Sequence, residues 1–180
     1  MTTTESGISS SSVDAYREKM FKMLGGRDPL EIMAQTALKL ADIVKRNPET
    51  ALRARPFADK WTPNEVIGHL TDTEWVYGYR LRLILSEDNP TILNTQQDAW
   101  VAALRYNERD PRELVEIFRT LRELNLAAWK RTSEDDLKRA GQHNERGPES
   151  LNAMLRLLAG HDLNHLDQIN RYLQAAQELT

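Results

Sequence analysis

Three of the four histidines in this chain are placed where a bundle of helices could bring them to one point. His161 and His165 are four positions apart, a spacing that puts both imidazoles on one face of a helix, about one turn from each other. His69 lies far upstream, in another segment with helical character. Three imidazole ligands would leave part of a metal's coordination sphere open. That arrangement is typical of catalytic metal sites rather than of closed structural ones.

The same histidines also have a simpler interpretation. A histidine on an apolar helix face is more often a hydrogen-bonded core residue than a ligand, and pairs four positions apart also occur by chance on exposed helices. Polar groups in a bundle core need partners, however, and one shared metal would satisfy all three imidazoles. The chain contains no Glu-x-x-His, of which a di-iron carboxylate bundle needs two, so a single metal ion is the better match.

Composition limits which chemistry is possible. The 180 residues suffice for one domain with a hydrophobic core. A formal net charge of −3 gives no indication of the basic face that nucleic-acid binding requires. The chain has no cysteine, which excludes disulfides, thiolate ligands and a cysteine nucleophile. A metal would have to be held by imidazole, carboxylate and water, and we expect the substrate to be a small molecule.

The N-terminal segment and the hydropathy of the chain indicate in which cellular compartment the protein is expected. No apolar run approaches the roughly 20 residues needed to cross a bilayer, so no membrane partner is expected. Residues 1–12 lack the basic start and apolar stretch of a secretory signal, and their Ser/Thr content predicts a disordered tail. We therefore expect a cytoplasmic protein in which residues 13–180 form one helical domain.

Three helix starts are marked in the same way. At Asp28, Thr62 and Asp110, a residue able to cap a helix is followed by proline at the first helical position and glutamate at the third. A fourth start is expected near Gly147. The segments that follow carry apolar residues at spacings of three and four. The sequence thus predicts an all-α four-helix bundle without strands, with main helices over 29–46, 63–86, 111–131 and 149–178 and shorter helical pieces over 13–24 and 95–106.

The connections between these helices are long. Residues 47–61, 86–97 and 132–148 all exceed the two to eight residues usual between neighbouring helices of a bundle. Such loops either build the rim of a pocket or are ordinary long connections, and the sequence does not decide between the two.

Two stretches of the chain resemble the DinB superfamily. The run Trp61-Thr-Pro-Asn-Glu-Val-Ile-Gly-His69, followed by Arg80, is similar to the second helix of that family. The run from His143 to Leu151, followed by Ala159-Gly-His161-Asp-Leu-Asn-His165, is similar to its last helix and the loop before it. The resemblance covers about residues 28 to 175. It implies a four-helix bundle, usually a homodimer, in which one divalent metal is bound by His69, His161 and His165.

The remaining polar and aromatic candidates each have more than one interpretation. His143 matches a loop position of the family that is not usually a ligand, which favours a place at the pocket rim. Arg80 follows the first predicted ligand along one helix face, where it could bind an anionic group of a substrate. Pairing of Arg80 with a buried carboxylate such as Glu74 is slightly favoured. Trp100 and Tyr106 are expected to pack in the core rather than to line a pocket.

Three carboxylates near the predicted ligands are candidates for acid or base chemistry. Glu65 and Asp72 are the candidate catalytic residues, and Asp162 lies between the two C-terminal histidines. Each could instead orient an imidazole N–H or be a solvated surface charge. We favour the orienting role for Glu65 and the surface for Asp162.

The resemblance also implies a range of activities. Characterised members of the superfamily are thiol S-transferases or isomerases that use bacillithiol or mycothiol, and others are described as metal-dependent hydrolases. Because this chain lacks cysteine, a thiol would have to come from a cosubstrate. The leading hypothesis is a metal-dependent thiol S-transferase that acts on small electrophilic compounds in a stress response. A hydrolase that uses metal-bound water and a non-enzymatic, metal-stabilised dimer are the alternatives. Zinc and nickel are the favoured metals, while iron and manganese also accept three imidazoles.

Overall fold

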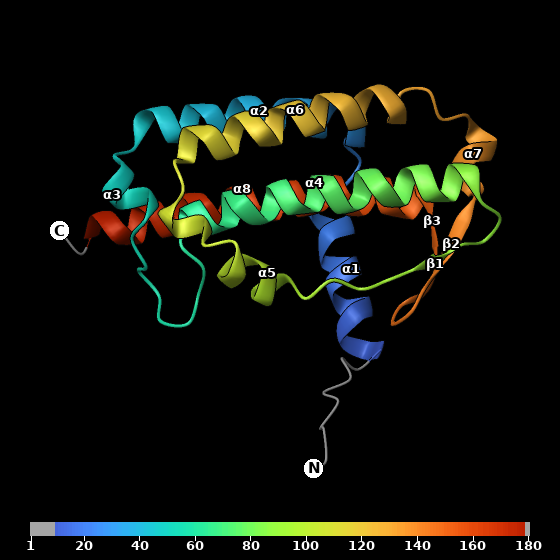
Figure 1. Ribbon diagram of the computed structural model, residues 1–180, viewed down its shortest axis with the longest axis horizontal. Coiled ribbons are helices and arrows are strands. Elements are labelled where there is room, and N and C mark those ends of the chain that lie inside the picture. The colour runs from blue at the N-terminus through green and yellow to red at the C-terminus, as the bar shows by residue number, and fades with distance from the viewer. Residues whose placement is uncertain (1–9, 179–180) are drawn as a thin grey trace, which may run out of the picture.

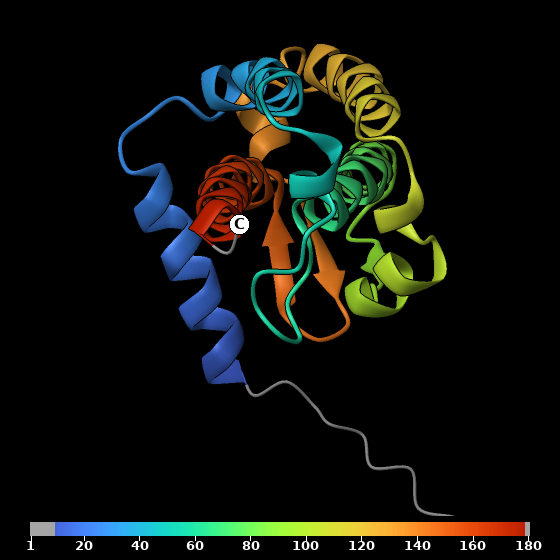
Figure 2. The ribbon, with the colours of Figure 1, turned by 90° about the vertical axis from the view of Figure 1, so that its left-hand side faces the viewer.

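Four long helices form the body of the protein in this computed structural model, which describes residues 10–178. They are α2 (Pro29–Arg46), α4 (Pro63–Ser86), α6 (Pro111–Trp129) and α8 (Leu151–Glu178). Helix α2 packs against α6 and α8, and α4 packs against the same two helices, as the end-on view in Figure 2 shows. Of the four long helices, α2 therefore lies diagonally opposite α4, which is the next long helix in the chain. Likewise, α6 lies diagonally opposite α8. The predicted four-helix bundle is confirmed.

The diagonal arrangement explains two of the long connections, because the chain must cross an end of the bundle between these helix pairs. The first crossing contains the short helix α3 (Glu49–Leu52), and the second contains α7 (Glu134–Lys138). The connection from α4 to α6 contains helix α5 (Gln97–Ala103) and a 3-10 turn (Tyr106–Glu108), which together replace the helical piece predicted over 95–106.

A small sheet at one end of the bundle shows that the prediction of no strands was wrong (Figure 1). Strand β1 (Thr91–Ile92) runs parallel to β2 (Ala140–His143), which pairs in antiparallel fashion with β3 (Gly147–Ser150). The last helix, predicted over 149–178, begins two residues later at Leu151, because residues 147–150 form β3. Strands of two and four residues are too short to show a periodic pattern in the sequence.

Helix caps follow the expected chemistry in part. Thr62 and Glu65 form a complete capping box, in which each side chain accepts a hydrogen bond from the other's backbone N–H. Asp28 and Asp110 each accept a hydrogen bond from the backbone N–H two positions later, at 2.8 Å. In all three cases the following proline occupies the first turn, as predicted.

An additional helix, α1 (Ser10–Leu24), crosses α8 outside the four-helix bundle (Figures 1 and 2). It begins within the segment that we expected to be a tail, and the rest of that expectation falls on residues 1–9, outside the described residues. The crossing depends on Gly160, where a Cβ atom would lie 2.2 Å from the backbone oxygen of Met20. No helix within residues 10–178 has the length and apolar character to cross a membrane.

The bundle interior contains two apolar clusters separated by a buried polar layer. Each of the four long helices contributes one side chain to this layer, and none of these residues is more than 2% exposed. The four residues are Thr36, Glu74, Arg122 and Asp162. Burial of the last of these means that the surface position expected for Asp162 was wrong.

Arg122 is the centre of this polar layer. Its Nη1 and Nη2 atoms donate to the two carboxylate oxygens of Asp162 at 2.5 and 3.0 Å, and Nη2 lies 2.8 Å from Oε1 of Glu74. Thr36 donates to Asp162 at 2.7 Å, and Asn125 donates to Glu74 at 3.0 Å. Burial lowers the pKa of Arg122, but the two carboxylates raise it by more, so the side chain stays a cation. The layer therefore joins all four long helices through a single guanidinium group.

We predict that Arg122→Met lowers the free energy of unfolding by about 3–5 kcal/mol, because two carboxylates lose their buried cation. Urea denaturation followed by circular dichroism measures this. Arg119→Met is the matched control, since Arg119 lies on the same helix but pairs with Glu116 and Glu123 at the surface. It should leave the unfolding midpoint nearly unchanged. Equal effects of the two substitutions would contradict a structural role for the buried layer.

Candidate metal centre

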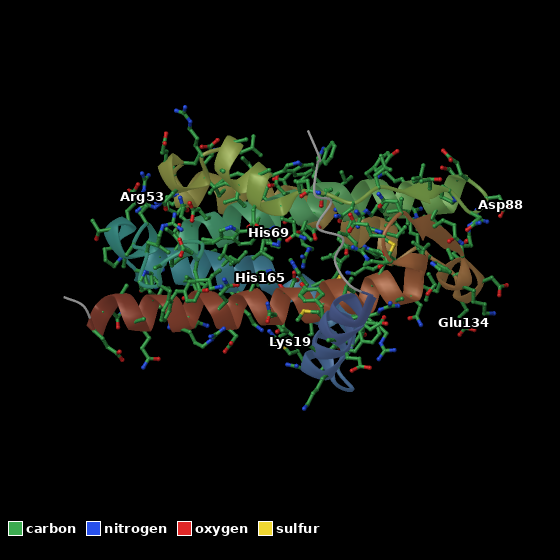
Figure 3. All side chains as sticks on the ribbon, turned by 90° about the horizontal axis from the view of Figure 1, so that it is seen from below. Lys19, Arg53, His69, Asp88, Glu134 and His165 are labelled. Carbon is green, nitrogen blue, oxygen red and sulfur yellow. The ribbon has the colours of Figure 1, made fainter. Side chains whose placement is uncertain are left out.

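The three predicted ligands converge in the structure. His69 projects from α4 and His165 from α8 into the space between these helices, as Figure 3 shows. The Nε2 atom of His161 lies 3.1 Å from Nε2 of His69 and 3.0 Å from Nε2 of His165. One nitrogen from each imidazole lies within 4.8 Å of the other two. All three residues are buried. The structure thus brings together two neighbouring positions of one helix and a distant position of another.

These distances fit a bound metal better than they fit hydrogen bonds. Two nitrogens at about 2.0–2.1 Å from one tetrahedral zinc ion are about 3.3 Å apart. Nε2 of a neutral imidazole carries either one hydrogen or one lone pair, so Nε2 of His161 cannot satisfy two neighbouring nitrogens. The Nδ1 atom of His161 is buried and has no hydrogen-bond partner within residues 10–178. Hydrogen bonding in the protein therefore does not explain the burial of this side chain.

The protonation states also suit a metal. Burial lowers the pKa of His69 to about 3 and that of His165 to about 4. The pKa of His161 lies well below its usual value, mainly because of burial and also because of electrostatic interactions with His165, His69 and Arg122. Only neutral imidazole binds metal, so the site holds its histidines in the form that a cation requires.

Neighbouring side chains orient the imidazoles. Nδ1 of His165 lies 2.7 Å from Oε1 of Gln168, and the amide of Gln168 donates to the hydroxyl of Tyr172 at 3.1 Å. An Nδ1–H donor to Gln168 leaves the Nε2 lone pair of His165 directed at the cluster. The ring of Trp61 lies 4.7 Å from the His69 ring and 6.5 Å from the His165 ring, centroid to centroid. Sequence reasoning did not assign Gln168 and Tyr172 to the site. Their polar character on the same helix face as His165 is the signal that could have indicated it.

A cavity of about 560 Å³ adjoins the three histidines. All three histidines line it, and the rest of its wall comes from α1, α4, α5, β3, α8 and two loops. These loops contribute residues 94–96 and 145–146, so two of the three long connections do form the pocket wall. The volume is in the range of sites that bind small molecules.

The two candidate catalytic carboxylates differ in position. Asp72 lines the cavity, where its Oδ1 accepts a hydrogen bond from Tyr106 at 2.6 Å and its Oδ2 is buried without a partner among the described residues. Burial raises the pKa of Asp72, against the opposing effects of Tyr106 and Arg109. Glu65 binds Arg55 through both carboxylate oxygens at 2.9 and 3.0 Å and caps its own helix. Its carboxylate therefore stabilises the start of α4 instead of orienting an imidazole.

His143 and Arg80 were the predicted substrate contacts. His143 lies in β2, is buried, and accepts backbone N–H groups of Glu145 and Arg146 at Nδ1. It is not among the residues that line the cavity. Arg80 does line the cavity. The expected pairing of Arg80 with Glu74 was wrong, because Glu74 is bound by Arg122.

Tyr106 and Trp100, both expected to pack in the core, lie in different surroundings. Tyr106 packs in the core as expected, with its ring against Gly68, where a Cβ atom would lie 2.1 Å from the ring. Trp100 lines the cavity, contrary to the expectation, and its ring contacts Trp75 at a centroid distance of 6.4 Å.

Comparisons with known proteins agree with this geometry. The family model of the DinB superfamily matches residues 31–169. A protein from Oceanobacillus iheyensis, named as a putative metal-dependent hydrolase, is 30% identical over 61% of this chain and 63% of its own length. A protein of the same description from Halalkalibacterium halodurans is 26% identical over 64% of this chain and 67% of its own. The match thus spans less than two thirds of the first relative.

The fold also has a solved counterpart. The structure of YfiT from Bacillus subtilis, described as a probable metal-dependent hydrolase with an unusual four-helix bundle topology, matches with a TM-score of 0.76. The two chains are 20% identical, and the match covers 96% of this chain and 92% of that one. At this level of identity the likeness concerns the fold, whose diagonal connections are described above.

We predict close to one divalent metal ion per chain in protein purified without a His-tag, and almost none in the double variant His161→Ala/His165→Ala. Inductively coupled plasma mass spectrometry measures the metal content. His143→Asn is the control, because it removes a histidine outside the cluster and should leave the metal content unchanged. A wild-type protein that binds neither its own metal nor added zinc or nickel would contradict a metal centre.

We also predict that the metal-free protein loses stability as the pH falls from about 6.5 towards 4. The histidines have an ordinary pKa of 6.5 in the unfolded chain but about 3 for His69 and about 4 for His165 in the folded one. The unfolded state therefore binds more protons in this range, so the free energy of unfolding must decrease with falling pH. Melting temperatures across this range should fall less steeply in His161→Ala/His165→Ala. If the melting temperatures of wild type and variant fell equally with pH, the imidazoles would not be held neutral by burial.

Proposed function

Because the chain belongs to the DinB superfamily, we propose that its three histidines form the divalent metal centre of an enzyme that transfers a low-molecular-weight thiol to small electrophilic compounds. The observation that supports this most directly is the convergence of three neutral imidazoles on the wall of a cavity of about 560 Å³. Three protein ligands leave coordination positions for a reactant, and the cavity leaves room for a thiol cosubstrate beside an electrophile.

The protein side chains around this centre have separate tasks in the proposal. The neutral imidazoles leave the charge of a divalent ion uncompensated, which would favour the ionised form of a bound thiol. Gln168 and Tyr172 hold the His165 ring in one orientation, and the Trp61 ring packs beside the rings of His69 and His165. Asp72 supplies a cavity-facing carboxylate of raised pKa, at which a proton released by the thiol could be held.

A metal-dependent hydrolase is the second candidate. It is favoured by the Oδ2 atom of Asp72, which has no hydrogen-bond partner within the described residues, and by the hydrolase descriptions of the related proteins. In either reaction the metal would lower the pKa of the nucleophile that it binds. The homodimer, the choice of zinc or nickel and a role in stress responses stay predictions from the family resemblance.

The test follows the consumption of monochlorobimane by metal-loaded protein, with and without an added low-molecular-weight thiol. We expect thiol-dependent turnover that His161→Ala abolishes with little change in melting temperature, and that Asp72→Asn reduces by about 10²-fold or more. His143→Asn should retain the wild-type rate. Turnover of an ester or amide panel without any thiol would favour the hydrolase instead. A His161→Ala protein that unfolds would indicate a structural metal.

A further inference from the structure

Arg80 is a buried cation in the cavity that lacks a carboxylate partner. It is 4% exposed, and no ion pair within the described residues 10–178 includes it. The neighbouring buried charges of Arg146 and Glu149 compensate each other. Arg146 binds both oxygens of Glu149 at 2.7 and 2.8 Å. A buried charge without a partner is costly, and such a residue in a cavity indicates that the missing partner belongs to a ligand.

The surroundings hold the Arg80 guanidinium in place without neutralising it. Its Nη2 atom donates to the backbone oxygen of Leu93 at 2.7 Å, and its Cζ atom lies 5.0 Å from the centroid of the Tyr77 ring. A guanidinium has five N–H donors in a fixed plane, so these contacts leave donors for a further acceptor. Burial lowers the pKa of Arg80 and Arg146 lowers it further, while Tyr77, which also forms a side-chain hydrogen bond with Arg80, and Glu149 raise it.

The position of Arg80 relative to the metal centre sets the length of the ligand. His69 and Arg80 both line the cavity and are eleven positions apart on α4. Eleven residues correspond to a rise of about 16 Å along a helix, and a long side chain leans back towards the helix N-terminus. A molecule that reaches both the histidines and Arg80 must therefore extend over roughly 10 Å.

We propose that Arg80 anchors a carboxylate at one end of an elongated substrate or cosubstrate, whose other end reaches the three-histidine centre. A guanidinium plane matches a carboxylate through two parallel hydrogen bonds, which makes arginine the suitable residue for this anion. The part of this proposal in which the ligand reaches a metal rests on the proposed function. The anchor itself does not, since it is built from Arg80, Tyr77 and the Leu93 carbonyl alone.

Calorimetric titration with octanoate and its neutral analogue octanamide tests the anchor. Octanoate should bind wild-type protein at least about 10-fold more tightly than octanamide, and Arg80→Met should weaken octanoate binding by roughly 10- to 100-fold without affecting octanamide. Arg80→Lys should fall between, because it keeps the charge but not the planar pair of donors. Arg82→Met is the control, since Arg82 is an exposed arginine on the same helix that does not line the cavity. Equal octanoate affinity in wild type and a folded Arg80→Met protein would overturn the proposal.

The metal-free double variant His161→Ala/His165→Ala separates this proposal from the proposed function. The anchor predicts that this variant still binds octanoate and that adding Arg80→Met abolishes the binding. Loss of octanoate in the double variant, with no effect of Arg80→Met in the loaded protein, would place the carboxylate on the metal and overturn the anchor. These titrations measure binding alone, so they test the anchor even if the protein does not turn over monochlorobimane.

Turnover identifies which reactant carries the carboxylate. The two thiols to compare are 8-mercaptooctanoate and 8-mercaptooctanol. If Arg80 anchors the thiol, the wild-type protein should have a lower KM for the acid than for the alcohol. In Arg80→Met the two KM values should be equal. Equal KM values for the two thiols, beside tighter binding of octanoate than of octanamide, would assign the anchor to the electrophile. Both results support an anion site at Arg80.

Discussion

The structure depends on the ion pairs that Arg122 makes in the middle of the bundle. Arg122 comes from α6, yet its carboxylate partners lie on α4 and α8, the two helices that carry the three clustered histidines. Asp162 directly follows His161, and Glu74 is five positions after His69. Any rotation or shift of either helix that moved the imidazoles would also pull a carboxylate away from its buried cation. A buried ion pair adds little net stability compared with apolar packing, but it tolerates few alternative arrangements. Here it fixes the register of the helices that build the site.

Helix α8 has a double role because it is buried on more than one face. His161 and His165 face α4 and the cavity, whereas Asp162 faces α2 and α6. The polar layer and the three-histidine cluster thus lie at the same level of the bundle, between the two apolar clusters. This placement gives each cluster the packing that stabilises the fold and concentrates the polar side chains where they can satisfy one another. It also helps to keep His161 neutral, because the positive charge of Arg122 disfavours protonation of that imidazole.

The convergence of His69, His161 and His165 could be predicted from the sequence, because the spacing of two of them is set within a helix and their motif is distinctive. The errors share a physical cause. Asp162 was expected at the surface because a charged residue between two core-facing histidines must face another way, and a sequence does not say that this other face is buried as well. Arg80 and Arg122 were both able to neutralise Glu74, and only the packing of α6 against α4 decides between them. The strands were missed because two- and four-residue segments carry no periodicity, and the pairing of β1 with β2 joins residues about fifty positions apart.

The close contact between Gly160 and Met20 places a wall of the cavity on a helix that lies outside the bundle. Tyr16 and Arg17 line the cavity from α1, whereas the ligands and their supporting residues belong to α4 and α8. The shape of the binding site is therefore separable from the geometry of its reactive centre. Substitutions along α1 can change which molecules fit without disturbing the imidazoles. Because α1 shapes the cavity and α4 and α8 carry the histidines, the range of substrates can change while the chemistry is kept. This requires that residue 160 remains glycine, so that α1 can pack against α8.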